Sequence, residues 1–362
     1  MSLESQPLVS VLTPVYNGER YLSECIESVL AQTYQNWEYC IVNNCSTDRT
    51  LEIAQTYAER DKRIRIHNNK EFVSFSQNWN IAFRQIPLSS RYCKVVHADD
   101  WLFPECVMRM VELAEAHPTV AIVGAYALRN DHVAWDGLPY PSTVFPGREI
   151  CRKSFLGGPY VFGSPTSLLI RSDEARKRPE FYSNTNLHCD IEVCLDILAD
   201  RDFGFVHQVL TFTREHSEAQ SAFSRRFGTD YLATLEHLTK YGRTYLSERE
   251  FEGCLTRCWE RYYAFLGAKV FQTTEKGFWK FQRNKLEKLG YSLSHLKVAM
   301  PVLVELLDLA LNPMKTTMRV ARKIAHLSGH TTRSVEQTDS RGKDSSALPR
   351  NFQQHSNREA LK

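Results

Sequence analysis

Polar residues that could do chemistry stand next to predicted buried elements at four places in this chain. Pro14 to Asn17 and Asn43 to Asp48 follow the first two apolar runs, Asp99 and Asp100 follow a later run, and Asp190 opens a predicted helix. Adjacent carboxylates at a strand end suit Mg²⁺ or Mn²⁺, which are hard cations that prefer oxygen ligands and bridge to substrate phosphates. The residue types therefore point to metal-assisted chemistry on a phosphorylated substrate.

The same residues also fit a purely structural role. Asp99 and Asp100 precede a predicted helix and Asp190 stands at a helix start, where aspartate commonly caps free peptide N–H groups. At the level of single residues, both interpretations stay open.

Alternating strands and helices must position the first three segments. Apolar runs at 8–13, 37–42, 64–67, 92–97 and 120–126 predict buried strands, and residues 19–34, 51–58 and 76–84 have apolar side chains at helical spacing. Such alternation produces an α/β fold, a mostly parallel sheet with helices on both faces. Ligands bind at the carboxyl ends of the strands in such sheets, so we expect the polar segments to line one crevice.

The rest of the chain divides by composition. Residues 127–185 are rich in loops with one strand at 167–170, a helix follows near 187–198, and 203–211 resemble a strand. Residues 230–326 have a helical pattern throughout, and 331–362 are polar with few apolar residues. We therefore expect a domain at 1–229 with a nucleotide-binding half (1–126) and an acceptor half (127–229), a helical extension at 230–330 and a disordered tail at 331–362.

Charge and cysteine usage exclude several classes of protein. The 362 residues contain 45 Lys and Arg against 42 Asp and Glu, a net charge of +3, which is no footprint of a nucleic-acid binder. The 10 cysteines form no Cys-x-x-Cys pair, so we expect reduced, mostly buried thiols. The first residues lack the pattern of a secretory signal, and the apolar segment 298–311 is interrupted by Pro301 and two acids. We expect a cytoplasmic protein.

Four motifs occur in an order that resembles one known family. LVSVLTPVYNGERYLSECIESVLAQTY, WEYCIVNNCSTDRTLEIA, KVVHADDWLFPECV and HCDIEVCLDIL together resemble the family-2 inverting glycosyltransferases, over about residues 8–217. The resemblance implies the GT-A fold, a Rossmann-like nucleotide-diphospho-sugar transferase fold.

The resemblance assigns donor and metal roles to individual positions. Pro14 and Tyr16 match the loop that cradles the nucleotide base, Asn44 matches the usual acidic base contact, and Asn78 matches a residue on the diphosphate side. The acidic pair matches an Asp-x-Asp element, which implies that Asp99 contacts the donor and Asp100 holds Mn²⁺ or Mg²⁺. His97 stands where a further Asp is common, and imidazole is an acceptable ligand for Mn²⁺.

The base loop departs from the family pattern. The usual Asp-Asp-Gly-Ser-Thr-Asp is Asn43-Asn44-Cys45-Ser46-Thr47-Asp48 here. An amide both donates and accepts hydrogen bonds, whereas a carboxylate only accepts, so base recognition should differ. We favour a UDP-sugar as donor.

The remaining roles concern catalysis and the acceptor. Asp190 matches the catalytic base, which takes the proton of an acceptor hydroxyl as its oxygen displaces the nucleoside diphosphate. Ser164 and Thr166 match the segment that shapes the acceptor side. Arg214 and His216 match an Arg-x-His element in which Arg214 pairs with phosphate and His216 approaches the metal.

A basic segment, Met314 to Leu327, has four Lys or Arg and no acid interleaved with apolar residues. It could lie on an anionic membrane or pack as a solvated helix on its own domain, and the membrane interpretation suits a lipid-linked acceptor. The sequence thus predicts a metal-dependent inverting transferase of cell-surface polysaccharide assembly that uses a glycan or lipid-linked acceptor. The alternatives are a non-catalytic nucleotide-sugar-binding scaffold and a sugar nucleotidyltransferase, although the Gly-rich basic loop of the latter is poorly matched.

Overall fold

The computed structural model describes residues 6–184, 188–216, 220–273 and 275–311. The chain divides into two compact units, of which the first comprises residues up to 225 together with 233–255. The second comprises 226–232 and the chain from 256 onwards. The expected tail at 331–362 and the basic segment 314–327 lie outside the described residues.

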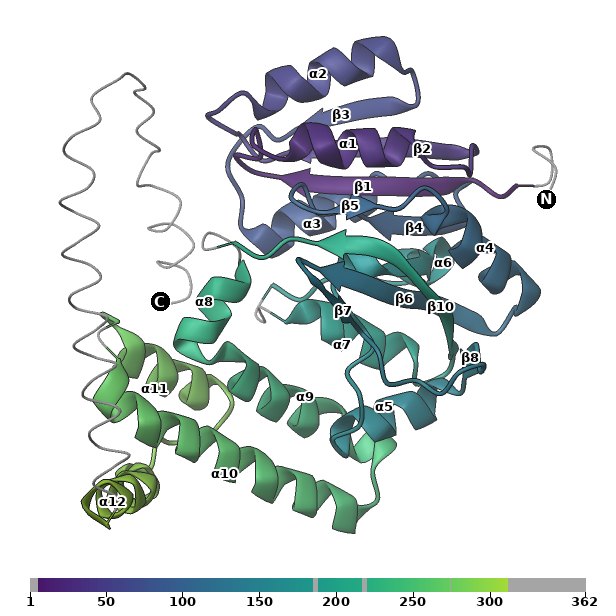
Figure 1. Cartoon of the computed structure of the whole chain (residues 1–362). Coiled ribbons are helices and arrows are strands. Elements are labelled where there is room, and N and C mark those ends of the chain that lie inside the picture. Colours follow the sequence, from purple (N-terminus) through teal and green to yellow (C-terminus); the bar gives the residue numbers. More distant parts are fainter. Residues whose placement is uncertain (1–5, 185–187, 217–219, 274, 312–362) are drawn as a thin grey trace, which may run out of the picture. The chain divides into compact units, whose positions relative to one another are not determined.

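A single sheet forms the centre of the first unit, and its strands follow the order β3-β2-β1-β4-β9-β6-β10-β5, with β7 paired to β6 and β8 to β10 (Figure 1). The strands are β1 (Val9–Val15), β2 (Trp37–Asn43), β3 (Ile64–Asn68), β4 (Tyr92–Val95), β5 (Trp101–Leu102), β6 (Val120–Arg129), β7 (His132–Ala134), β8 (Val144–Phe145), β9 (Leu168–Arg171) and β10 (Asp202–Thr213).

Strand direction brings six carboxyl ends to one edge of this sheet. Strands β1, β2, β3 and β4 pair in parallel, as do β6 and β10. Strand β9 is antiparallel to both β4 and β6, so those two strands run in the same direction. The carboxyl ends of β1, β2, β3, β4, β6 and β10 therefore lie at the same edge, and the predicted α/β fold is confirmed.

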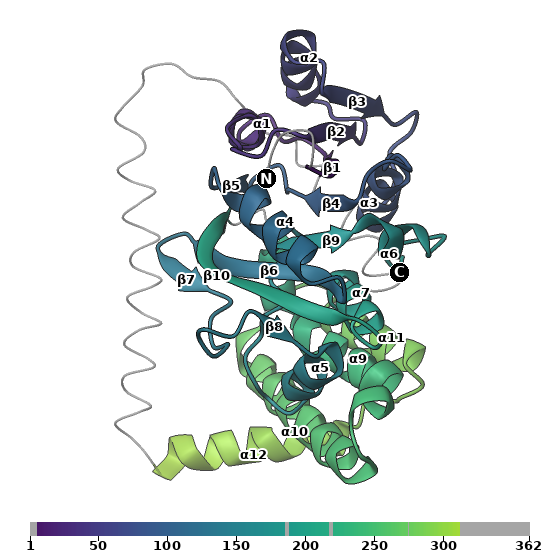
Figure 2. The same cartoon turned by 90° about the vertical axis from the view of Figure 1, so that its right-hand side faces the viewer.

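Helices cover both faces of the sheet (Figure 2). Helices α1 and α4 lie on one face and share a core with β1, β4 and β6, whereas α3 and α6 lie on the other. The helices are α1 (Leu22–Leu30), α2 (Thr50–Arg60), α3 (Phe75–Arg84), α4 (Cys106–Ala116), α5 (Gly147–Phe155), α6 (Ser172–Arg176), α7 (Cys189–Ile197), α8 (Gln220–Phe227), α9 (Thr229–Tyr245), α10 (Glu248–Gln272), α11 (Phe278–Lys288) and α12 (His295–Leu311), with a 3₁₀ turn at Pro165–Ser167.

The apolar periodicity of the sequence explains this core. In α1, Leu22, Ile26 and Val29 recur at helical spacing and are completely buried. Strand β1 is buried along its whole length, as expected of a central parallel strand. The run expected at 92–97 ends as a strand at Val95, because the chain turns there and Asp100 N donates to His97 O at 3.0 Å.

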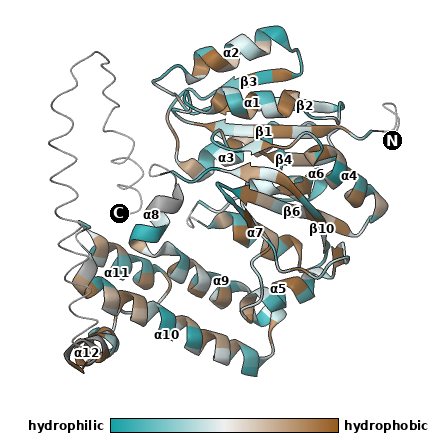
Figure 3. Ribbon diagram, in the orientation of Figure 1, coloured by the Kyte–Doolittle hydropathy of each residue, from teal (hydrophilic) through white to brown (hydrophobic). Residues whose placement is uncertain are grey.

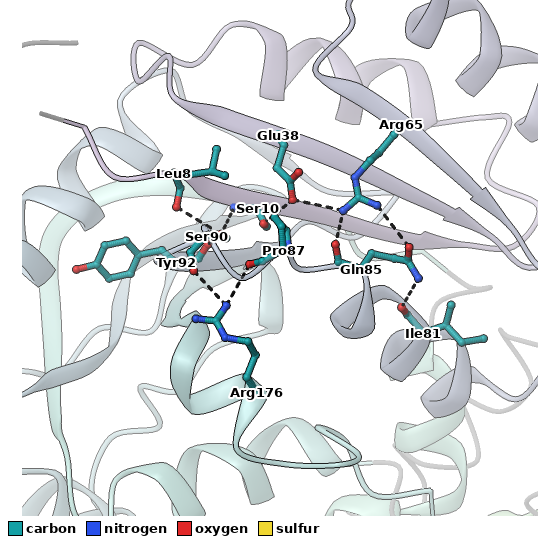
Figure 4. A network of polar contacts seen from close by, with 10 residues as sticks. All are labelled: Leu8, Ser10, Glu38, Arg65, Ile81, Gln85, Pro87, Ser90, Tyr92 and Arg176. Atoms are coloured by element: carbon teal, nitrogen blue, oxygen red, sulfur yellow. Dashed lines mark hydrogen bonds and ion pairs between the residues drawn. The ribbon is translucent and has the colours of Figure 1, made fainter. Parts of the chain in front are cut away.

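A polar network ties the beginnings of the first three strands together (Figure 4). Glu38 Oε1 accepts hydrogen bonds from Ser10 Oγ at 2.7 Å and from Arg65 Nη2 at 3.3 Å. The Arg65 guanidinium also donates to the backbone and the side chain of Gln85 at the end of α3. This network lies at the edge of the sheet opposite the strand ends.

The second unit is helical where it is described. Its buried residues include Tyr262, Phe278, Phe281 and Gln282, and Gln282 Nε2 donates to Phe227 O at 2.6 Å. Helix α12 is largely hydrophobic (Figure 3), with seven apolar side chains between 47% and 78% exposed. Among the described residues, no helix combines the length and hydropathy needed to cross a membrane.

Candidate functional site

The polar segments singled out in the sequence gather where the parallel strands end. Tyr16 directly follows β1, Asn44 follows β2, and Asp99 and Asp100 lie shortly after β4. Arg214 follows β10, which is parallel to β6. Pro14 lies buried within β1 opposite Val42 of β2.

The loops after β1 and β2 are joined by hydrogen bonds. Asn17 N donates to Ser46 Oγ at 2.9 Å, and Thr47 N donates to Asn17 Oδ1 at 2.8 Å. Both Asn17 and Cys45 have positive φ, a conformation that the family's glycine would adopt more readily than Cys45. The Tyr16 ring meets the half-exposed Phe72 ring edge-on, with centroids 4.9 Å apart.

Three buried amides form a cluster beside these loops. Asn44 Oδ1 accepts from Val73 N at 3.0 Å and Asn69 Nδ2 at 2.9 Å, while its Nδ2 donates to Val73 O at 2.9 Å. Asn69 Nδ2 also donates to Asn78 Oδ1 at 2.9 Å. Asn44 thus pairs with both backbone groups of Val73, which a carboxylate could not do because it has no donor.

Asp100 is the most buried carboxylate of the site. Its side chain is 2% exposed, and its oxygens accept from Thr166 Oγ1 at 2.6 Å and from Arg214 N at 2.9 Å. Helix α4 begins after Glu105 and has no side-chain cap. The helix-capping interpretation of the acidic pair is therefore wrong, because its carboxylates bond to Arg214 N after β10, to Thr166 in the 3₁₀ turn and to His216 instead.

Asp99 bonds to a histidine from a distant part of the sequence. His216 Nε2 lies 2.9 Å from Asp99 Oδ2. Burial raises the pKa of Asp99, but the His216 hydrogen bond and the charge of His97 outweigh it, so that the pKa falls below its ordinary value. Asp99 is therefore ionised at neutral pH.

His97 completes a group whose donor atoms suit a divalent cation. One ligand atom each of His97, Asp99 and Asp100 lies within 4.8 Å of the others. His97 Nε2 is buried and has no hydrogen-bond partner among the described residues. Burial lowers the pKa of His97, but Asp100 and the charges of Asp99 and Asp190 raise it above its ordinary value. A set of two carboxylates and one imidazole fits Mn²⁺ better than Mg²⁺.

The predicted phosphate ligand Arg214 is engaged at this site. Its Nε donates to Asp99 O at 3.0 Å, its Nη2 bonds to Glu24 Oε2 at 2.5 Å, and its guanidinium lies 4.3 Å from the Tyr21 ring centroid. Thr166, assigned to the acceptor side, is completely buried and supports Asp100. Ser164 precedes the 3₁₀ turn that carries Thr166.

Asp190 occupies the second position of α7, and His188 is the N-cap residue. Asp190 is therefore not the N-cap residue of α7, and the N-cap interpretation is wrong. Burial raises the pKa of Asp190 above its ordinary value, although the neighbouring His188 opposes this. Because the charge of Asp190 also acts on His97, the predicted base and the acidic pair belong to one electrostatic neighbourhood.

Comparison with known proteins identifies the family. The profile of Glycosyl transferase family 2 matches residues 10–177. The putative glycosyltransferase EpsE of Bacillus subtilis is 31% identical over 229 residues, which cover 62% of this chain and 78% of EpsE. The chain belongs to glycosyltransferase family 2. An uncharacterized glycosyltransferase of Haemophilus influenzae is 36% identical over 124 residues, which cover 34% of this chain and only 38% of that relative.

Solved structures agree on the fold of this family-2 protein. S. aureus TarS in complex with UDP-GlcNAc matches with a TM-score of 0.56 at 15% identity, over 78% of this chain and 80% of the other. The mannosyltransferase PcManGT from Pyrobaculum calidifontis, in complex with GDP-Man and Mn²⁺, matches with a TM-score of 0.52 at 14% identity, over 86% and 88% of the two chains. The fold is GT-A, as the sequence motifs implied.

Several residues of the glycosyltransferase site were not apparent from sequence. Asn69 bridges Asn44 and Asn78, and Glu24 pairs with Arg214 across 190 residues of sequence. Asn69 directly follows β3, and an asparagine at that position was the sequence signal that could have identified it. No local pattern marked Glu24, because it resembles any exposed acid on an amphipathic helix.

Proposed function

We propose that this family-2 protein is an inverting, metal-dependent glycosyltransferase that moves a hexose-type sugar from a nucleoside-diphosphate donor to a hydroxyl of a glycan or lipid-linked acceptor. The observation that carries the proposal is the grouping of His97, Asp99 and Asp100 after β4, with one ligand atom of each within 4.8 Å of the others. The cell-surface polysaccharide setting is supported by relatives such as a putative teichuronic acid biosynthesis glycosyltransferase of Bacillus subtilis.

In this proposal, Asp190 accepts the proton of the acceptor hydroxyl. Burial raises the pKa of its carboxyl group, which makes the carboxylate a stronger base than an exposed aspartate. The acceptor oxygen attacks the anomeric carbon as the bond to the diphosphate breaks, and one displacement inverts the configuration. No covalent sugar-enzyme intermediate is required.

Asp99, Asp100 and His97 would hold a divalent cation, with His216 fixing the orientation of Asp99. Such a cation supplies positive charge beside the leaving diphosphate. Thr166 and the backbone of Arg214 keep the Asp100 carboxylate in place. We propose Mn²⁺ rather than Mg²⁺ because of the imidazole in the set.

The donor is proposed to be a UDP-sugar, with its base against Tyr16 and beside the amide of Asn44, and with Asn78 on the diphosphate side. The amide cluster is uncharged, which suits a neutral base edge. The matched TarS complexes hold UDP-GlcNAc and UDP, whereas PcManGT holds GDP-Man. A thermal-shift panel of UDP, GDP, dTDP and CDP with Mn²⁺, Mg²⁺ or chelator would identify the base, because a ligand that binds only the folded state raises the Tm.

We further propose a cytoplasmic enzyme that touches the inner face of the membrane through α12 and the basic segment that follows it. The exposed apolar residues of α12 and the Lys and Arg residues at 315–323 suit an anionic bilayer. Sedimentation of the protein with phosphatidylglycerol vesicles, but not with phosphatidylcholine vesicles, is the expected result. Equal partition with both vesicle types would contradict it.

The transferase proposal is tested by Asp190→Asn, with Asp196→Asn on the same helix as the matched control. The side chain of Asp196 pairs with Arg178 at the protein surface. We expect Asp190→Asn to lower kcat by about 100-fold or more while the donor Kd changes only a few-fold, and Asp196→Asn to leave both unchanged. Transfer at the wild-type rate by Asp190→Asn would remove Asp190 from its role. A folded wild-type protein that binds donor and never transfers sugar would instead be a scaffold.

A further inference from the structure

A cavity of about 330 Å³ lies in the helical second unit, none of whose residues belongs to the glycosyltransferase site. Three helices and the loop between the last two border it. The residues that line it include Val270 of α10, Trp279 and Arg283 of α11, and His295, Val298 and Val302 of α12. Its volume equals that of roughly eleven water molecules and lies at the lower end of the roughly 300–1,000 Å³ range of small-molecule sites. The cavity is therefore large enough for a ligand.

Close packing of α12 against α10 fixes the walls of this cavity. A Cβ at Gly267 would lie 2.6 Å from Pro301 Cβ, so only glycine allows the two helices to approach each other so closely there. The contact lies within one helical turn of lining residues on both helices. Just before α12 begins, Ser294 N donates to the Tyr263 hydroxyl oxygen at 3.3 Å. The cavity is therefore a feature of packed helices.

The lining is largely apolar, and this decides the chemistry of the ligand. The apolar residues that line the cavity at its α11 and α12 side are Trp279, Leu293, Val298, Ala299 and Val302. Apolar cavities are poorly hydrated and bind apolar ligands. A protein helix is roughly 10–12 Å across and could not enter this volume, whereas a single alkyl chain could. These features favour an alkyl chain as the occupant.

Arg283 supplies a positive charge beside the same cavity. It is exposed, and it makes no hydrogen bond or ion pair with any described residue. The Lys297 ammonium, in contrast, lies 5.9 Å and 5.6 Å from the ring centroids of Trp259 and Tyr263. His295 begins α12, where the helix dipole also favours an anion, and no Asp or Glu among the described residues lines the cavity. An anionic group at the edge of the cavity would pair with Arg283.

We propose that this cavity binds one acyl chain of an anionic phospholipid, whose phosphate pairs with Arg283. A phospholipid has two chains. Leu303 and Leu307 of α12 are both 53% exposed and follow the lining residue Val302 along the helix, so they can cover the second chain, whereas a free fatty acid would leave them exposed. The site differs from the membrane contact proposed above, because it holds a single lipid molecule and needs no bilayer. It does not depend on the proposed transferase function.

The test uses a lysophosphatidylglycerol with a dibrominated acyl chain, at concentrations below those at which it forms micelles. Bromine quenches tryptophan fluorescence on contact, and Trp279 is the tryptophan that lines the cavity. With the full chain, we expect saturable quenching at one lipid per protein. Trp279→Phe should abolish the quenching while calorimetry still detects binding. A lysophosphatidylcholine with the same chain should bind about threefold more weakly, because its positive choline opposes Arg283.

Two variants separate the cavity from the outer surface of α12. Ala299 is exposed and lines the cavity, so Ala299→Phe should fill it without unfolding the protein and raise the lipid Kd about tenfold or more. Arg283→Gln should raise the Kd about threefold. Leu296→Phe is the matched control, because Leu296 is 75% exposed on α12 and does not line the cavity. It should leave the Kd unchanged.

Several results would overturn the lipid site. An unchanged lipid Kd in Ala299→Phe, with a Tm close to that of the wild type, would show that the chain lies outside the cavity. Equal binding of the two lysolipids by the wild type, together with an unchanged Kd in Arg283→Gln, would remove the anionic head group. Quenching that appears only with vesicles would place the chain in the bilayer. Saturable binding of the lysolipid by a protein that binds no sugar nucleotide would support the lipid site and defeat only the proposed function.

Discussion

The two edges of the parallel sheet carry polar networks of opposite character. At the strand beginnings, the Glu38 carboxylate accepts from Ser10 and Arg65, and Arg65 also donates to Gln85 (Figure 4). At the strand ends, three carboxylates lie in one electrostatic neighbourhood with two histidines. Arg214, the nearby guanidinium, has its side chain paired with Glu24.

The comparison indicates that the polar groups at the strand beginnings stabilise the sheet, whereas those at the strand ends are arranged to bind a ligand. Each charge in the Ser10–Glu38–Arg65 network meets an opposite charge or a hydrogen-bond partner, so the network can only hold strands together. The carboxylates at the strand ends concentrate negative charge, which is unfavourable for folding and useful for holding a cation. Substitutions at the two edges should therefore have opposite effects on activity and stability.

The largest effect is expected from Asp100→Asn at the carboxyl edge. The amide can still accept from Arg214 N and can donate to Thr166 Oγ1, so the fold should be retained while the negative charge is lost. We expect kcat/KM to fall by about 100-fold or more, with Tm within a few degrees of the wild type. Unchanged metal-dependent donor binding, measured by calorimetry with Mn²⁺ and with chelator, would place the cation elsewhere.

The next effect concerns pH. The pKa of Asp190 is raised from its ordinary value of 3.8 by burial. Because Asp190 must be ionised to act as the proposed base, kcat should fall about tenfold for each pH unit below that raised pKa, and the fall should begin at a higher pH than an ordinary aspartate would give. This pH dependence is checked by measuring kcat in stopped assays from about pH 4 to about pH 8. An acid limb at the ordinary value would mean that the carboxylate which titrates is not buried.

A smaller effect is expected from Asn44→Asp in the amide cluster. The carboxylate has no hydrogen to donate to Val73 O and lies only 3% exposed, so the loop at Val73 loses one contact and gains a repulsion. We expect a loss of about 1–3 kcal/mol in the free energy of unfolding and a fall in Tm of several degrees. An increase in Tm would show that the amide pairing with Val73 does not stabilise the loop.

The smallest effect is expected at the opposite edge, from Glu38→Gln. The amide oxygen can still accept from Ser10 and Arg65, and only the ion pair is lost. Because the pair is partly exposed, the free energy of unfolding should fall by less than about 1 kcal/mol. The kcat of folded protein should stay unchanged, and a fall in kcat would show that the two edges are coupled.

Much of the fold was predictable because its signals are local. The apolar runs that became β1 and β2, and the helical spacing of Leu22, Ile26 and Val29, follow from burial of one face or one strand. The acidic pair after β4 was also recognisable from local sequence, because two adjacent aspartates follow an apolar run. Because neighbouring strands are parallel, their carboxyl ends and the residues that follow them lie at the same edge of the sheet, as the sequence pattern had predicted.

Contacts across long stretches of sequence were not predictable. Thr166 lies 66 residues from Asp100, and Glu24 lies 190 residues from Arg214. Neither the buried Thr166 nor the exposed Glu24 differs locally from residues with no role. The sequence suggested that Thr166 faces an acceptor and Arg214 a phosphate, and both roles stay predictions beside the contacts that these residues make.

The sequence by itself determined the alternation of strands and helices over the first 126 residues, the acidic pair and the position of Asp190 at a helix start, because each depends on residue type and short-range spacing. Only the tertiary structure decided that Asn44 pairs with Val73, that His216 orients Asp99, and that Gly267 meets Pro301. The physical reason is that a hydrogen bond or a ring contact needs two partners at one place. One chain segment specifies its own side chains, and the fold as a whole specifies which of them meet.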